Sequence, residues 1–142
     1  MYKKILLPVD LYHKNSWGHK LSSALEIVRC FSSELYILNV VPDFGSGIVA
    51  QYFTEHAKLE MIQEAEKNLR EFVNENIPEN VKVTCVLAQG TVYESIIRAA
   101  DHIKVNLIII SAHRPELKDY LLGPNAAKVV RHSRVSVLVV RD

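Results

Sequence analysis

The sequence is poor in features that would point to a membrane, a secretion signal or a nucleic acid. No apolar run among its 142 residues is long enough to cross a bilayer. The first residues lead directly into a strand pattern, without the longer apolar region and cleavage site of a signal peptide. The formal net charge of +1 gives no field for holding nucleic acid through its phosphates. We therefore expect a cytoplasmic protein without a membrane or nucleic-acid partner.

Cysteine is scarce, and its spacing excludes a C-x-x-C redox or metal motif. Cys30 and Cys85 lie far apart in patterned segments, so we expect each to be a small buried apolar side chain. The sequence also lacks the G-x-x-x-x-G-K-[ST] loop of P-loop ATPases, which argues against fast phosphoryl transfer. No glycine-rich or Ser/Thr-rich phosphate loop follows Asp10, which disfavours a flavin-binding version of an α/β fold.

The sequence does contain a regular alternation of strand and helix patterns. Five short apolar segments rich in β-branched residues are typical of strands, and they span residues 4–9, 35–41, 81–87, 105–110 and 135–140. Helix patterns lie between them and begin near Trp17, Thr54, Thr91 and Ala126. This alternation predicts one domain over residues 1–142, an α/β fold with a doubly wound five-stranded parallel sheet in the order 3-2-1-4-5 and four helices on both faces. The third strand alternates more than the others, as expected at an edge.

Two further patterns concern the helices and the longest connection. Thr91 and Glu94 have the spacing of a capping box at the start of a helix. Residues 43–53 form an irregular stretch whose length is often found in functional lids. The helix pattern over residues 54–76 has charged residues on its other faces and one apolar stripe, made of Leu59, Ile62, Ala65, Leu69, Phe72 and Val73.

The carboxyl ends of the predicted strands carry residues suited to a nucleotide. Ligands of doubly wound sheets bind outside these ends, where the strand order reverses, here between the first and fourth strands. Three apolar residues at strand ends, Val9, Val40 and Ile110, can sandwich a base. Asp10 can accept hydrogen bonds from a ribose hydroxyl or hold a divalent cation beside phosphates. Alternatively, Asp10 is a solvated loop acid or a helix cap.

The segment that follows the fourth strand has the parts of a phosphate site. His113 and Arg114 form a basic pair, and Arg114 offers planar donors to a phosphate. The helix dipole and the free first N–H groups favour an anion at the next helix start, which is built from Gly123, Pro124, Asn125 and Ala126. The alternative is that these residues bind nothing, because every α/β protein has such helix starts and a lone histidine is weak evidence.

Three segments resemble the universal stress protein family, and the resemblance covers essentially the whole chain. Residues 2–10, YKKILLPVD, are similar to that family's first strand with its terminal aspartate. Residues 90–96, GTVYESI, are similar to its turn and third helix. Residues 111–141 are similar to its nucleotide motif, in the variant with a His-Arg-Pro turn, a leucine pair and Gly-x-Asn-Ala. The resemblance implies a stress-response regulatory protein that binds ATP, or AMP or ADP, with little or slow hydrolysis and with Mg²⁺ as a candidate companion.

The resemblance also assigns roles to individual residues. It places Pro8, Val9 and Asp10 in the base and ribose region, and it gives Val40 backbone contacts to adenine. The residues it places along the ribose and phosphates are Ile110, Ser111, His113 and Arg114, and those that would cradle the phosphates with backbone N–H groups are Gly123, Pro124, Asn125 and Ala126. It further implies a homodimer formed through the last strand, Val135–Val140, whose apolar edge would otherwise be unpaired.

Three residues depart from the family's G-x-x-G and G-[ST] motif. Ser111 and Arg114 stand where the motif has glycines, which limits how closely the backbone approaches a phosphate. Pro124 stands where the family carries Ser or Thr, so both a hydroxyl and a backbone N–H are missing. Losing two charge-assisted hydrogen bonds costs about 2–4 kcal/mol, or roughly 30- to 900-fold in affinity. We therefore expect weaker binding of an adenine nucleotide than in relatives with the hydroxyl.

Three functions follow from these patterns. The first is a regulatory protein in which bound ATP biases the segment 43–53 or the dimer. The second is a slow ATPase, in which Asp10→Asn would abolish hydrolysis. The third is a dimeric interaction module that no longer binds nucleotide, which Pro124 favours.

Overall fold

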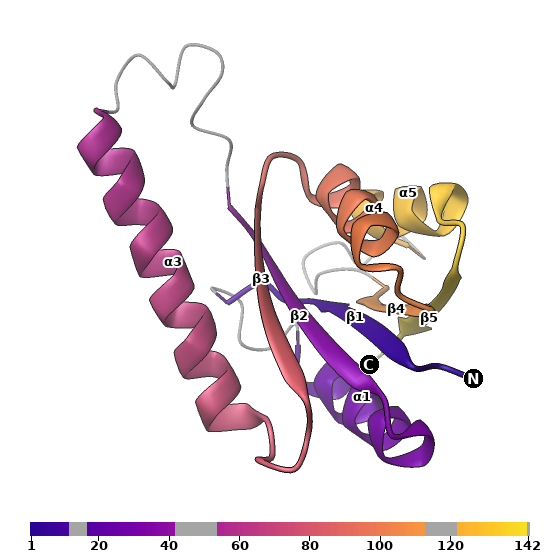
Figure 1. Ribbon diagram of the computed structural model, residues 1–142. Helices are drawn as coiled ribbons and strands as arrows, with labels where there is room; N and C mark the ends of the chain where they lie inside the picture. Colours follow the sequence, from indigo (N-terminus) through magenta and orange to yellow (C-terminus); the bar gives the residue numbers. More distant parts are fainter. Residues whose placement is uncertain (12–16, 42–53, 113–121, 142) are drawn as a thin grey trace.

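A computed structural model describes residues 1–11, 17–41, 54–112 and 122–141 of the chain (Figure 1). Its elements are β1 (Lys4–Pro8), α1 (Gly18–Phe31), β2 (Glu34–Val41), α3 (Glu55–Asn76), β3 (Val83–Gln89), α4 (Val92–Ile103), β4 (Leu107–Ser111), α5 (Pro124–His132) and β5 (Ser136–Val140). Within the described residues the strands form one parallel sheet in the order β3-β2-β1-β4-β5. The predicted fold class and strand order are confirmed.

The helices cover the two faces of the sheet. Because successive side chains of a strand point to opposite faces, Ile5 and Leu7 of β1 join the core cluster beneath α1 and α3. Leu6 points the other way and packs in the cluster beneath α4 and α5. All three side chains are fully buried. This burial explains the continuous apolar pattern of β1, since a central strand of a parallel sheet is covered on both faces.

The fifth strand begins one residue later than predicted, at Ser136 rather than at Val135, and two other predicted strands begin two residues later. The third strand begins at Val83 rather than at Val81, and the fourth begins at Leu107 rather than at Val105. In each case the earlier valine closes the turn after a helix, through an N–H bond to a backbone oxygen at the end of that helix or just beyond it. Lys104 ends α4 in the left-handed conformation, with a φ of 63°, so the chain cannot yet be extended there.

The capping box predicted at the start of α4 is wrong. Among the described residues, the Thr91 side chain accepts no cap hydrogen bond from the helix backbone. The Glu94 carboxylate instead accepts a hydrogen bond from the neighbouring Tyr93 hydroxyl at 3.3 Å. At the start of α3, by contrast, Thr54 Oγ1 accepts the N–H of Ala57 at 3.0 Å. The spacing permits a box, but in the structure Glu94 bonds Tyr93 and Thr91 makes no side-chain cap bond.

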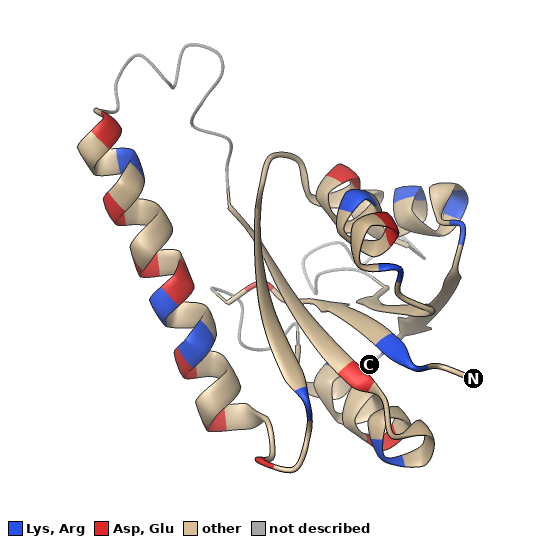
Figure 2. Ribbon diagram, viewed as in Figure 1, with Lys and Arg blue, Asp and Glu red and all other residues tan. Residues whose placement is uncertain are grey.

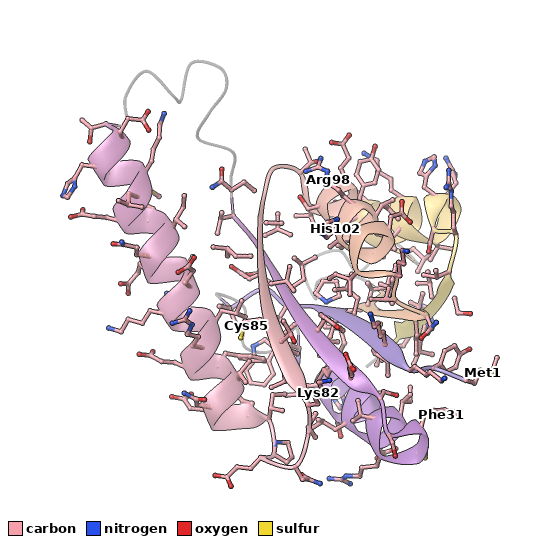
Figure 3. The ribbon with its side chains drawn as sticks, in the orientation of Figure 1. Met1, Phe31, Lys82, Cys85, Arg98 and His102 are labelled. Carbon is pink, nitrogen blue, oxygen red and sulfur yellow. The ribbon has the colours of Figure 1, made fainter. Side chains whose placement is uncertain are left out.

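The expectation that both cysteines are buried is also wrong, because Cys30 and Cys85 are exposed. Cys30 lies in the last turn of α1, off the face that carries the buried residues of that helix. Cys85 lies on the edge strand β3, on the side toward α3 (Figure 3). Partial desolvation raises the pKa of the Cys85 thiol, while the positive charge of Arg70 acts in the opposite direction.

α3 packs on the sheet through its C-terminal half. Leu69 and Phe72 are buried, and the Phe72 ring meets the Trp17 ring edge-on at 4.8 Å between centroids. Leu59 is 52% exposed and Ile62 and Ala65 are half-buried, so the apolar stripe predicted over residues 54–76 is only partly buried. Figure 1 shows the N-terminal end of α3 extending away from the strands, and the ribbon colours in Figure 2 mark acidic and basic residues along the helix. No helix in the described part of the chain is long and apolar enough to cross a membrane.

Candidate functional site

The turn that follows β1 lies at the centre of the carboxyl edge of the sheet. β1 pairs with β2 on one side and with β4 on the other, so the strand order reverses beside it, as predicted. Pro8 and Val9 are buried, and Asp10 is half-buried. The N–H of Val9 donates to the Leu38 carbonyl oxygen at 2.8 Å, which continues the pairing with β2 one residue beyond β1. This turn therefore presents Asp10 at the edge where ligands of such sheets bind.

Two buried polar side chains hold this turn, and sequence reasoning missed both. The Lys20 ammonium, from the first turn of α1, donates to the Pro8 carbonyl oxygen. Asn39 Nδ2, from β2, donates to the Val9 carbonyl oxygen at 3.1 Å. Each of the two residues is 7% exposed. The available signal was a polar residue on an otherwise apolar face, since Lys20 lies four residues before the buried Ala24 and Asn39 interrupts an apolar strand.

The charge of Lys20 is held in an unfavourable place. Burial lowers the pKa of the Lys20 ammonium to about 8, and the Asp10 carboxylate opposes this shift by attraction. The positive end of the α1 dipole lies at the same position, and the first turn of α1 contains no acidic residue. Asp10 is therefore the carboxylate identified as favouring the charged form of Lys20.

The ends of β2 and β3 form the next part of the edge. Val40 and Val41 are half-buried, and the N–H of Gly90 donates to the Val41 carbonyl oxygen at 3.0 Å. Gly90 has a φ of 124°, a backbone conformation that residues with a side chain rarely adopt, so glycine suits this turn. Within the described residues, the hydroxyl of buried Ser95 beneath Gly90 has no hydrogen-bond partner. Because β2 pairs with β1, Val40 lies near the carboxyl end of the strand beside the turn that carries Asp10.

A backbone bond brings the start of α5 to the end of β4. The N–H of Gly123 donates to the Ala112 carbonyl oxygen at 2.7 Å, and the N–H of Ala112 donates to the Val140 carbonyl oxygen at 3.0 Å. Ile110 is buried and Ser111 is half-buried. The helix begins at Pro124, two residues before the predicted Ala126. The strand end and the helix start are thus adjacent, as the sequence pattern required of a phosphate site.

The first turn of α5 offers backbone donors to an anion. Gly123 precedes the helix in an extended conformation, and Pro124 occupies its first turn without an N–H of its own. Pro124 and Asn125 are exposed, whereas Ala126 is buried against the sheet. The amides of Asn125 and Ala126 belong to the first turn, where an α-helix leaves N–H groups without intrahelical partners.

Some predicted residues lie outside the described part of the chain. They are His113 and Arg114, together with the segment 43–53. Among the residues that are described, no three His, Cys, Asp or Glu side chains gather in a way that could hold a metal ion by themselves.

The sequence pattern of the Universal stress protein family matches residues 1–141. Universal stress protein G from Shigella flexneri is 26% identical over 143 aligned positions, which cover 99% of this chain and 100% of that protein.

Solved structures of the same family share the fold. The structure of MJ0577, described as a structure-based assignment of biochemical function, is 29% identical and superposes with a TM-score of 0.75, covering 100% of this chain and 97% of that one. A universal stress protein from Archaeoglobus fulgidus, solved in complex with dAMP, is 21% identical with a TM-score of 0.69, and 97% of each chain is covered. On the match over residues 1–141, this chain belongs to the universal stress protein family.

Proposed function

We propose that this chain is a stress-response regulatory protein that binds an adenine nucleotide at the carboxyl edge of the sheet, between β1 and β4. The observation that carries the proposal is the Gly123–Ala112 hydrogen bond of 2.7 Å. It holds an anion-attracting helix start against the end of β4, the strand next to β1 and its Asp10-bearing turn. A carboxylate for ribose hydroxyls and backbone donors for phosphates are thereby supplied at one edge. The dAMP complex of the Archaeoglobus fulgidus relative supports this choice of ligand.

The proposed assignment follows the positions of the described residues. Val9, Val40 and Ile110 contact the base, and Asp10 accepts hydrogen bonds from the ribose. Asn125 and Ala126 donate backbone N–H groups to the phosphates, with Ser111 beside them. ATP is the proposed ligand, with AMP and ADP as shorter alternatives, and Mg²⁺ would accompany the phosphates near Asp10. His113 and Arg114 are proposed to complete the phosphate contacts.

The test is to denature freshly purified protein and separate the released small molecules by ion exchange beside nucleotide standards. We expect a peak of ATP or AMP that approaches one equivalent of protein. If none is found, thermal unfolding is followed at millimolar ATP with and without Mg²⁺, where binding raises the midpoint. An empty supernatant together with an unchanged midpoint would contradict the proposal and favour the interaction module.

We further propose a homodimer that forms through β5. β5 is an edge strand of the described sheet, and Leu138 on it is 36% exposed. An apolar strand edge in this position offers unpaired backbone groups to a second copy. Pairing of the β5 strands of two copies would satisfy these backbone groups and cover Leu138.

A further inference from the structure

We propose that Lys20 and Asn39 are positioning residues, which together hold the turn after β1 in the geometry that lets Asp10 receive the ribose hydroxyls of the nucleotide. This inference rests on the proposed function and adds two residues to it. Neither residue would touch the ligand. Their effect would be transmitted through the backbone of Pro8 and Val9 and through the charge of Lys20.

The backbone polar groups of Pro8 and Val9 all have hydrogen-bond partners. Pro8 has no N–H, and its carbonyl oxygen accepts from Lys20. The N–H of Val9 donates to Leu38, and its carbonyl oxygen accepts from Asn39. Every backbone polar group of these two residues is thus committed to a partner on another element. Asp10 is the next residue along the chain, so its direction is set by a fully bonded turn.

The two side-chain donors to this turn come from different elements. Lys20 belongs to α1, and Asn39 belongs to β2. They donate to consecutive carbonyl groups of one turn, and both side chains are buried. Buried polar groups that are fully bonded specify one arrangement and rigidify it. The turn is therefore held from both sides rather than by its own loop.

Position 20 carries a lysine although the site is buried. A buried ammonium at the positive end of a helix is a poor choice for stability, because an apolar side chain would fill the same space without desolvating a charge. What the ammonium adds is the hydrogen bond to the Pro8 carbonyl oxygen and attraction for the Asp10 carboxylate. Lys20 therefore acts on Asp10 twice, through the Pro8 carbonyl oxygen and through its charge.

The chain contains a matched control at the amino end of β1, opposite the carboxyl end where the proposed site lies. Lys4 begins β1, and its Nζ donates to the Ile103 carbonyl oxygen at 3.3 Å. The chemistry is that of Lys20, an ammonium on a backbone oxygen, but it lies at the amino end of the same strand. Lys4→Met should therefore leave nucleotide affinity unchanged.

The experiment measures binding by titration calorimetry for the native chain and for Lys20→Met, Asn39→Leu and Lys4→Met. Two ligands are compared, ATP and 2′,3′-dideoxy-ATP, which lacks both ribose hydroxyls. We expect Lys20→Met and Asn39→Leu to weaken ATP binding roughly tenfold, as for one lost hydrogen bond to a charged group. The dideoxy ligand should bind these variants and the native chain within about twofold, since it makes no bond for Asp10 to lose.

Each remaining outcome is decisive. Equal losses for both ligands would overturn the inference, because they would indicate general damage rather than an effect on the ribose. Unchanged ATP affinity in both variants would overturn it as well, while leaving the proposed function intact. A native chain that binds neither ligand would instead refute the proposed function, and the inference with it. If circular dichroism shows that Lys20→Met does not fold, Asn39→Leu provides the same test from the other side of the turn.

A double-mutant comparison separates positioning from a direct contact. In an Asp10→Asn background, Lys20→Met should cause no further loss of ATP affinity, because the group through which it acts is already altered. A further tenfold loss in that background would show that Lys20 acts on the ligand by another route and would overturn the assignment.

Discussion

The Lys20 ammonium donates a hydrogen bond to the Pro8 carbonyl oxygen, so a charged side chain is buried at the last residue of the central strand. This contact joins the first turn of α1 to the carboxyl end of β1, and it lies beside the proposed ribose acceptor Asp10. A buried charge of this kind has a measurable consequence for stability as well as for binding.

The free energy of unfolding of the native chain, relative to that of Lys20→Met, should rise with pH between about 8 and 10.5. The lower limit is the pKa of Lys20 in the folded chain, and the upper limit is the ordinary pKa of a lysine. Across this window the unfolded chain keeps the lysine proton and the folded chain releases it, so unfolding becomes less favourable as pH increases. The full change approaches about 3 kcal/mol, from the size of the shift. Urea unfolding of both proteins at pH 7, 8, 9 and 10 measures the difference between their free energies of unfolding. The contributions of the other titrating groups are shared by the two proteins and cancel in this difference. A difference that stays constant over this range would contradict the prediction.

Pro124→Ser should strengthen ATP binding, because serine restores a hydroxyl and a backbone N–H in the first turn of α5. If both groups bond a phosphate, the gain is about 2–4 kcal/mol, or roughly 30- to 900-fold. Calorimetric titration with ATP measures the gain, and adenosine serves as the control, since a ligand without phosphates should bind both chains alike. Equal ATP affinities would refute the argument that Pro124 weakens binding.

Two leucines of α3 should respond very differently to the same change. Leu69→Ala should lower the free energy of unfolding by about 2–5 kcal/mol, since this side chain is 1% exposed and its loss leaves a cavity. Leu59→Ala should change it by less than about 1 kcal/mol, because Leu59 is 52% exposed. Urea denaturation of the two variants decides the matter. Similar losses at both positions would mean that α3 packs along its whole length in solution.

Leu138→Lys should convert the proposed dimer to a monomer, because a charge on an edge strand opposes pairing with another strand. Sedimentation velocity of the native chain and the variant measures the effect. The matched control is Thr84→Lys, an exposed position on β3 at the other edge of the sheet, which should leave the dimer intact. A native chain that sediments as a monomer, or a variant that remains dimeric, would disprove pairing through β5.

The order of the strands was predictable because five short apolar runs alternate with clear helix patterns, and right-handed connections leave few topologies. The boundaries were less so, since Val81 and Val105 belong to the same apolar runs as the strands but close turns after helices. Capping chemistry was also beyond the sequence, because Thr91 and Glu94 have the right spacing while Glu94 bonds Tyr93. Local pattern identifies an element, whereas its ends depend on hydrogen bonds formed in the folded chain and vary by one or two residues.

The candidate site was predictable only in part. Asp10 and Gly123 were found because they follow recognisable strand and helix patterns. Lys20 and Asn39 were missed, since their partners are backbone oxygens ten or more residues away, which no local spacing reveals. The burial of the cysteines was misjudged as well, since the pattern places Cys30 on a helix and Cys85 on an edge strand but does not show which side chains cover them.

The sequence by itself determined the alternation of elements, the parallel sheet and its strand order, because hydrophobic periodicity is local and connection handedness leaves few topologies. The family membership also follows from the sequence, over residues 1–141. Only the tertiary structure decided which polar side chains meet at the carboxyl edge, how far α3 packs and which cysteines are covered. These properties depend on contacts between residues distant in the chain, where packing and desolvation rather than local propensity set the outcome.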